Sequence, residues 1–210
     1  MKIDWDNRKI MELLKQYLSG LKKAYFENGA EKDWEHFEKI KHGALQEDIE
    51  KLIYIYPNIP DTLIGMLEYV DGTYWREYAG EEISFYLLGS DVEEYPYYLL
   101  SSREIVANQN QAMEYYSDYI DRKYEGLEID DKITRHSSSL KWLHFSDCSN
   151  NGGTSQLFID FSPSDKGKPG QIVRFLHDPD EFKVIAGSFD EYLKNLIAHQ
   201  YDFINEDTVG

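Results

Sequence analysis

Apolar residues in the first quarter of the chain recur at intervals of three and four, which is the spacing of one face of a helix. From Trp5 to Phe26 they form a single stripe, and the lysines lie on the opposite face. A second apolar stripe follows over 45–53, after a polar bridge over 28–33. We therefore expect residues 1–53 to form a helical extension that packs on the domain that follows.

The segment YPNIPDTLIGMLEYVDG predicts one more helix, because it has helical apolar spacing and a signal at each end. Proline is favoured in the first turn of a helix, which places the start at Pro60. The apolar stripe runs from Leu63 to Val70, and the turn at Asp71-Gly72 ends it.

The middle of the chain contains both strand and helix signals. Runs over 83–88 and 96–100 are rich in aromatic and branched residues and are bounded by turn residues, which is typical of strands. Ser101 and Glu104 have the spacing of a capping box, so a long helix is expected to begin there. The residues after that helix, 121–132, predict an acidic exposed loop.

The last third of the chain changes to strand patterns and closes with a helix. Ser188 and Glu191 mark the start of that helix by their spacing. Helices followed by a run of strands indicate an α+β fold. We predict a single α+β domain in which an antiparallel sheet has helices packed on one side, plus the N-terminal amphipathic helix. The strand-like runs cover residues 140–145, 157–161, 172–176 and 182–185.

The composition is that of a globular protein. Hydrophobic residues make up 41% of the chain and aromatic residues 15%, which is enough for a packed core. The longest apolar runs fall short of the roughly 20 residues that span a bilayer, and the charged N-terminus lacks an apolar signal core. The single cysteine, Cys148, cannot form an internal disulfide and agrees with a reducing compartment. We expect a cytoplasmic protein.

The formal net charge is −17, and its distribution is uneven. Residues 61–131 hold 17 Asp and Glu against 4 Lys and Arg, a net of −13. Such a field repels nucleic acid and anionic membranes, and it raises the rate of encounter with a basic partner. We therefore expect neither nucleic acid nor a membrane as a partner.

The Gly-rich segment PSDKGKPG at 163–170 could be a phosphate-holding loop or a hairpin turn. A Walker-type loop ends in Gly-Lys-Ser/Thr and opens a helix whose N–H groups hold the phosphate. Here the segment leads into a strand, which favours the hairpin turn. The NNGG stretch at 150–153 likewise predicts a hairpin.

Two sets of residues could carry chemistry. His144, Asp147 and Cys148 could form a metal site or a Cys-His pair, but residues three or four apart do not meet on a strand as they do on a helix. A buried thiol and a hydrogen-bonded histidine are therefore favoured. Adjacent carboxylates usually diverge, which favours a solvated rim over acid–base chemistry. The adjacent pairs are Glu81-Glu82, Glu93-Glu94 and Asp130-Asp131. We expect no catalytic residue, no cofactor and no metal.

Aromatic and acidic residues are mixed along TYWREYAGEEISFYLLGSDVEEYPYYLL. Tyr and Trp anchor protein interfaces and acidic neighbours favour a basic partner, so this segment predicts a partner-binding surface. The alternative is that its tyrosine-rich strands are simply half-buried. The candidate partner-binding residues are Trp75, Glu81, Glu82, Asp91, Glu93, Glu94, Tyr95, Tyr97 and Tyr98.

The order of four segments over residues 54–197 carries a family resemblance. These segments are YPNIPDTLIGMLEYVDG, WLHFSD, NNGGTSQLFIDFSPSDKGKPGQIV and SFDEYLKNL. Together they resemble the SMI/KNR family of the SUKH superfamily, whose pattern consists mostly of turn and packing positions. The matching positions are Pro57, Pro60, Gly72, Trp142, Gly152, Gly153, Asp160, Pro163, Gly167 and Gly170. Asp71 stands where the family often shows Asn, a conservative change in a turn.

The resemblance implies a SUKH-like α+β domain over residues 54–210 without enzymatic activity. Fungal members of the family regulate cell-wall assembly, and many bacterial members neutralise a toxin, often a nuclease, by binding it. We expect a bacterial immunity protein that binds a basic toxin domain, which suits the acidic field because nuclease sites must be basic. Two alternatives stay open, a regulatory scaffold in cell-wall or signalling assembly and a hydrolase that uses His144 or the paired carboxylates. The oligomeric state is also open.

Overall fold

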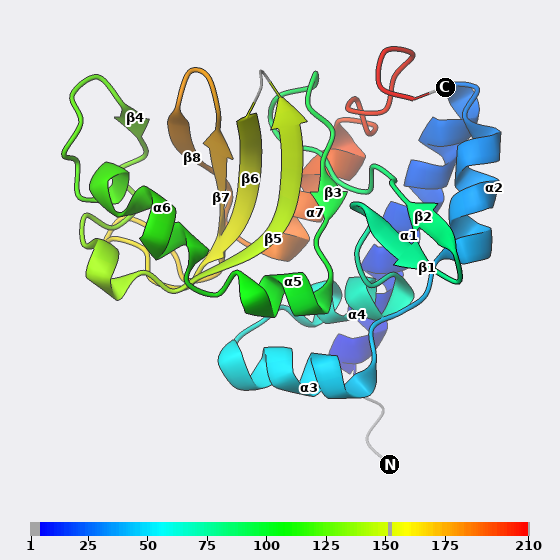
Figure 1. Ribbon diagram of the computed structural model, residues 1–210, viewed down its shortest axis with the longest axis horizontal. Coiled ribbons are helices and arrows are strands. Elements are labelled where there is room, and N and C mark those ends of the chain that lie inside the picture. The colour runs from blue at the N-terminus through cyan, green and yellow to red at the C-terminus, as the bar shows by residue number, and fades with distance from the viewer. Residues whose placement is uncertain (1–4, 151–152, 210) are drawn as a thin grey trace.

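The structure is a computed structural model that describes residues 5–150 and 153–209. The helices are α1 (Trp5–Glu27), α2 (Glu31–Ile40), α3 (Gln46–Ile55), α4 (Asp61–Tyr69), α5 (Ser102–Ala107), α6 (Gln111–Ile120) and α7 (Phe189–Ala198). The strands are β1 (Arg76–Tyr78), β2 (Glu81–Ile83), β3 (Tyr98–Leu99), β4 (Glu128–Ile129), β5 (Trp142–Asn150), β6 (Gly153–Asp160), β7 (Gln171–Leu176) and β8 (Glu181–Ala186). Helices α1 to α4 gather at one end of the molecule, and a curved sheet with α6 beside it lies at the other (Figure 1).

The second helix, α2, begins inside the stretch for which the sequence predicts a polar bridge. Trp34, Phe37 and Ile40 of this helix are buried at a spacing of three. Its start has no polar cap, because Ala30 occupies the N-cap position and makes no side-chain hydrogen bond. A short apolar stripe among many charged residues, without a start signal, explains why the helix escapes prediction.

The capping box predicted at Ser101 is present. The hydroxyl of Ser101 accepts a hydrogen bond from the N–H of Glu104 at 3.2 Å, and the Glu104 carboxylate accepts one from the N–H of Ser101 at 2.8 Å. The single long helix expected after it is instead α5 and α6. The break falls at Asn108, whose side-chain amide lies 3.2 Å from Nδ1 of His144, and asparagine side chains compete with helical backbone bonding.

The main sheet has the strand order β3-β5-β6-β7-β8-β4. All neighbours in it are antiparallel except β4, which runs parallel to β8 and lies in the segment predicted as a loop. The strand predicted over 83–88 is mostly irregular, since β2 ends at Ile83 and Leu88 makes only an isolated bridge to Tyr97. β1 and β2 form a separate two-stranded hairpin.

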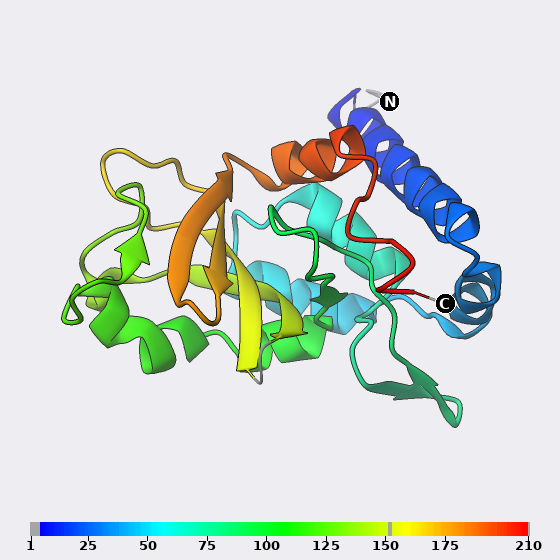
Figure 2. The same ribbon diagram turned by 90° about the horizontal axis from the view of Figure 1, so that it is seen from above.

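The α+β fold class is confirmed, but helices cover both faces of the sheet. One face carries the larger core with α1, α4 and α7, where Phe145 packs against Phe189. On the other face Tyr116 of α6 packs with Trp142 and Phe158. Figure 2 shows the sheet between α7 and α6. The difference arises because β5, β6 and β7 present apolar side chains alternately to both faces.

The N-terminal helix α1 contributes to the larger core. Its Tyr17 hydroxyl donates to the carbonyl of Leu87 at 2.7 Å, and its Tyr25 hydroxyl donates to the carbonyl of Tyr86 at 2.8 Å. Leu21 lies fully buried between them along the helix. α1 thus packs on the rest of the domain, while the division of the chain at residue 53 stays a prediction.

The family positions that can be located act in turns and packing. Pro60 is the N-cap residue of α4, so the helix begins one residue later than predicted. Gly72 has φ of +88°, and a Cβ there would lie 2.8 Å from the backbone nitrogen of Ser101, so only glycine fits. Gly152 lies outside the described residues.

The connection between β6 and β7 is the hairpin loop that the sequence predicts. Asp160 is fully buried at its start and accepts hydrogen bonds from the N–H of Ser162 at 2.7 Å and from Nε2 of Gln171 at 3.0 Å. Burial raises the pKa of Asp160, although these hydrogen bonds oppose the shift. Two buried polar side chains therefore fix the shape of this loop.

Candidate functional site

Four aromatic rings form a row beside the sheet edge at β3, which we call the aromatic ladder. Trp75 lies against Tyr74, Tyr74 against Tyr98, and Tyr98 against Tyr86, with ring centroids 5.8, 4.5 and 4.7 Å apart. The outer end is open, because Trp75 is 63% exposed, whereas the other three rings are half-buried. The ladder therefore presents a large aromatic side chain to solvent on a supported base.

The backbone of Trp75 lies in the left-handed region, with φ of +47°. For a bulky residue this conformation costs about 1–3 kcal/mol and is most often found at functional sites. Nearby, the hydroxyls of Tyr74 and Ser149 are 3.4 Å apart, which ties the ladder to β5. An exposed indole on a strained backbone is a candidate contact residue for a partner.

The β1–β2 hairpin that follows Trp75 is acidic, and we call it the acidic hairpin. Its register places Glu77 directly opposite Glu82, and both are exposed. Neither makes an ion pair within the described part of the chain. Like charges directly opposite on neighbouring strands are destabilising, so this pair favours the approach of a cation.

The third glutamate of the acidic hairpin has partners within the fold. Glu81 lies 3.6 Å from Nδ1 of His36 and 3.5 Å from Nζ of Lys39, both on α2. These contacts fasten the hairpin to α2, beside which it projects in Figures 1 and 2. Glu81 thus supports the hairpin, and Glu77 and Glu82 carry its unneutralised charge.

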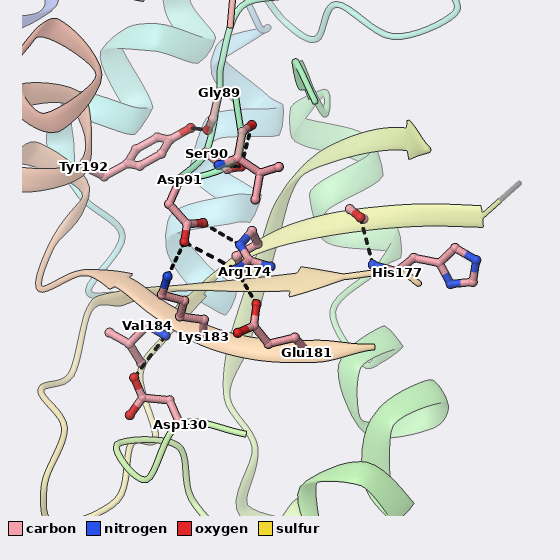
Figure 3. A network of polar contacts seen from close by, with 12 residues as sticks. Gly89, Ser90, Asp91, Asp130, Arg174, His177, Glu181, Lys183, Val184 and Tyr192 are labelled. Carbon is pink, nitrogen blue, oxygen red and sulfur yellow. Dashed lines mark hydrogen bonds and ion pairs between the residues drawn. The ribbon is translucent and has the colours of Figure 1, made fainter. Parts of the chain in front are cut away.

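A network of ion pairs around Asp91 lies over β7 and β8, away from the acidic hairpin (Figure 3). Asp91 binds the guanidinium of Arg174 at 2.5 Å and the ammonium of Lys183 at 2.6 Å. Arg174 is only 2% exposed and also pairs with Glu181 at 2.5 Å. Burial acts to raise the pKa of Asp91, but the bonds from Arg174 and Lys183 outweigh it and lower that pKa. Asp91 therefore stabilises the fold.

The structure brings together only part of the predicted partner-binding set. Trp75 and Tyr98 belong to the aromatic ladder, and Glu81 and Glu82 to the acidic hairpin beside it. The prediction that Tyr97 is a contact residue is wrong, because its ring is fully buried. The remaining residues lie on the loop between β2 and β3. Asp91 contacts β7 and β8, whereas Glu93, Glu94 and Tyr95 follow it in the loop before β3, and a partner-binding role for all four stays a prediction.

Sequence reasoning missed Tyr74, Tyr86 and Glu77. The two tyrosines read as members of ordinary aromatic runs, and only the path of the chain between β2 and β3 stacks them with Tyr98. The role of Glu77 depends on the hairpin register, for which the Gly80 turn was the available signal.

Of the residues considered for chemistry, His144 and Asp147 meet, contrary to the expectation for a regular strand, because a bulge shifts the register of β5 between His144 and Ser146. His144 is buried, and its Nε2 lies 2.7 Å from the Asp147 carboxylate. Cys148 packs in the larger core, on the opposite face of β5, and burial and then Asp147 raise the pKa of its thiol to about 12. In residues 5–150 and 153–209, no group of three or more His, Cys, Asp or Glu side chains could hold a metal ion. Across the same residues, none of the helices has the length and apolar character to span a bilayer.

Comparison with known proteins places these features in a family. The sequence model of the SMI1/KNR4 family (SUKH-1) matches residues 43–195, which include the aromatic ladder and the acidic hairpin. This match confirms the family resemblance found in the sequence. The matched region begins at residue 43, shortly before α3, whereas the resemblance begins at residue 54. A search of curated proteins gives no match.

Proposed function

Since the chain belongs to the SMI1/KNR4 family (SUKH-1), which is known for immunity proteins and cell-wall regulators, we propose that it is an immunity protein of the bacterial cytoplasm. It binds a basic toxin domain directly and blocks it, with no chemistry of its own. A nuclease is the favoured toxin class, because a nuclease site must be basic to hold phosphate.

The facing pair of Glu77 and Glu82 next to the exposed Trp75 is the observation that carries this proposal. An arginine from a partner relieves the repulsion between the two carboxylates and can stack on an aromatic face. Aromatic anchors ringed by complementary charge are the common composition of interface hot spots. The aromatic ladder and acidic hairpin together thus fit a basic protein surface.

The first experiment identifies the partner. The tagged protein is captured from the producing cell at low and then raised salt, and the bound proteins are identified by mass spectrometry. We expect one basic protein that is lost as salt rises and that is toxic when expressed alone. Partners of unrelated charge that ignore salt would point to a regulatory scaffold instead.

The second experiment locates the surface with two variants of equal charge change. Glu77→Gln with Glu82→Gln should slow association with the purified toxin by about tenfold at low salt, because steering charge is lost. Glu93→Gln with Glu94→Gln, on the loop between Asp91 and β3, is the matched control and should keep a rate near that of the wild type. The opposite ranking, measured by stopped-flow mixing, would move the binding surface to that loop.

A further inference from the structure

A pocket of about 330 Å³ lies between the β6–β7 loop, the end of β8 and the start of α7. Three lysines line it, Lys132 from the segment before β5 and Lys166 and Lys168 from the loop. This is a concentration of positive charge in a chain that has 22 Lys and Arg against 39 Asp and Glu. It lies away from the aromatic ladder and the acidic hairpin, on elements that the proposed function does not use.

Two of the three ammonium groups make no direct ion pair within the described part of the chain. Lys166 pairs with Asp131 at 2.5 Å, whereas Lys132 and Lys168 make no ion pair with any residue that the structure describes. Glu191 also lines the pocket, but its carboxylate accepts the N–H of Gly187 at 3.1 Å and caps the start of α7. The pKa of Asp131 is lowered first by its hydrogen bond with Lys166 and also by the nearby charge of Lys132, so Lys132 is partly compensated without a direct ion pair, whereas Lys168 makes no ion pair with any described residue.

One buried side chain holds both lysine-bearing segments in place. Gln171 is 1% exposed, and its Oε1 accepts the backbone N–H of Lys168 at 3.1 Å. Its Nε2 donates to the backbone carbonyl of Lys132 at 3.2 Å and to Asp160 at 3.0 Å. These hydrogen bonds fix the spacing between the backbones of Lys132 and Lys168 before a ligand binds. Binding therefore costs less conformational entropy of the protein.

We propose that this pocket binds a small phosphate-bearing molecule through the side chains of Lys132 and Lys168, with Lys166 at the rim. Lysine ammonium groups bind phosphate as point charges, so the site needs neither a Walker loop nor a helix N-terminus. The volume lies at the lower end of the range for small-molecule pockets, which favours a compact ligand. A nucleic acid polymer is disfavoured, because the net charge of −17 repels it.

The test uses the full chain with inorganic pyrophosphate as the probe, titrated at constant ionic strength. Wild-type protein should bind it saturably, and the amide chemical shifts that change should centre on residues 132 and 166–171. Lys132→Gln with Lys168→Gln should weaken binding by about a hundredfold, or about tenfold for each charge-assisted contact. Both lysines are exposed, and unchanged circular dichroism would show that the variant folds.

The matched control is Lys23→Gln with Lys51→Gln, which makes the same charge change on the exposed faces of α1 and α3. It should keep the wild-type affinity for pyrophosphate. The proposal is overturned by any of three results: no saturable binding, shift changes that centre elsewhere, or equal weakening by both double variants.

Discussion

Trp75 combines an exposed indole with a left-handed backbone, and the two effects can be separated by experiment. Trp75→Gly removes the ring and suits the positive φ, but glycine also gains freedom in the unfolded chain by about 0.5–1 kcal/mol. The free energy of unfolding should therefore change little. If the proposed toxin is the partner, its affinity should fall by about 2 kcal/mol or more, as at an interface hot spot.

Urea unfolding and calorimetric titration measure these two quantities on the same samples. Tyr54→Ala is a suitable control, because Tyr54 on α3 has an exposed fraction of 87%, the highest of any large aromatic side chain whose burial the structure describes. It should change neither quantity. A large loss of stability in Trp75→Gly with unchanged affinity would assign the ring to folding and contradict the proposed surface.

Trp75 belongs to the part of the site that can be predicted from the sequence, whereas other residues of the site cannot. Composition alone selects Trp75 and Tyr98, since aromatic and acidic residues are dense around both. It cannot select against Tyr97, because adjacent residues on a strand point to opposite sides and the sequence does not reveal which side is the core. Nor can it join Tyr74 to Tyr86, whose stacking through Tyr98 depends on how the chain folds back.

At the scale of elements, the turn of the acidic hairpin contains a strained residue, Ala79, whose strain a substitution can relieve. Ala79 and Gly80 form a two-residue connection with φ of +52° and +80°, the pattern of a type I′ turn, in which asparagine is preferred at the first position. Ala79→Asn should stabilise the hairpin by about 1 kcal/mol, since alanine is penalised in the left-handed region. Slower amide hydrogen exchange in β1 and β2 measures the gain.

Gly80→Ala provides the opposite change at the neighbouring position. It should speed exchange in the hairpin, because alanine at φ of +80° is strained even though no atom lies near the added Cβ. Equal exchange rates in the two variants would mean that the turn does not limit the order of the hairpin.

Elements with strong local signals agree best between sequence and structure. The helix at Ser188 and the hairpin loop before Gln171 are predicted because side-chain caps and turn residues encode them locally. α2 lacks a cap, and β4 is held by pairing with β8 over only two residues, so neither leaves a local signal. The coverage of the second face by α6 depends on the break at Asn108, a contact between distant parts of the chain.

For the whole molecule, Asp91 predicts a pH dependence of stability. Its pKa in the folded protein is lowered below the ordinary value of about 3.9. The stabilisation is therefore fully present above about pH 4 and is lost as the pH falls through the lower folded-state value. Asp91→Asn should cost about 2 kcal/mol at pH 7, because charged hydrogen bonds to Arg174 and Lys183 are lost.

Thermal unfolding of both proteins at pH 7 and at pH 2.5 checks the sign. The difference between wild type and Asp91→Asn should shrink in acid, because below the ordinary pKa of an aspartate the unfolded state binds the proton and the advantage of the folded-state carboxylate declines. Lys194→Gln, on the exposed side of α7, serves as a control that should leave the difference between the two pH values unchanged. A gap for Asp91→Asn that is equal at both pH values would show that packing, and not charge, explains the loss.

Because Cys148 is buried, the reactivity of its thiol reports local unfolding of the protein. The chain has one thiol, and in the folded state it is covered by the core and held protonated, with a pKa raised to about 12. An alkylating reagent can therefore react only when β5 separates from its neighbours, so the labelling rate reports how often the sheet comes apart. A toxin that binds the native fold would slow this labelling without approaching the sulfur, which turns one unreactive atom into an assay for complex formation.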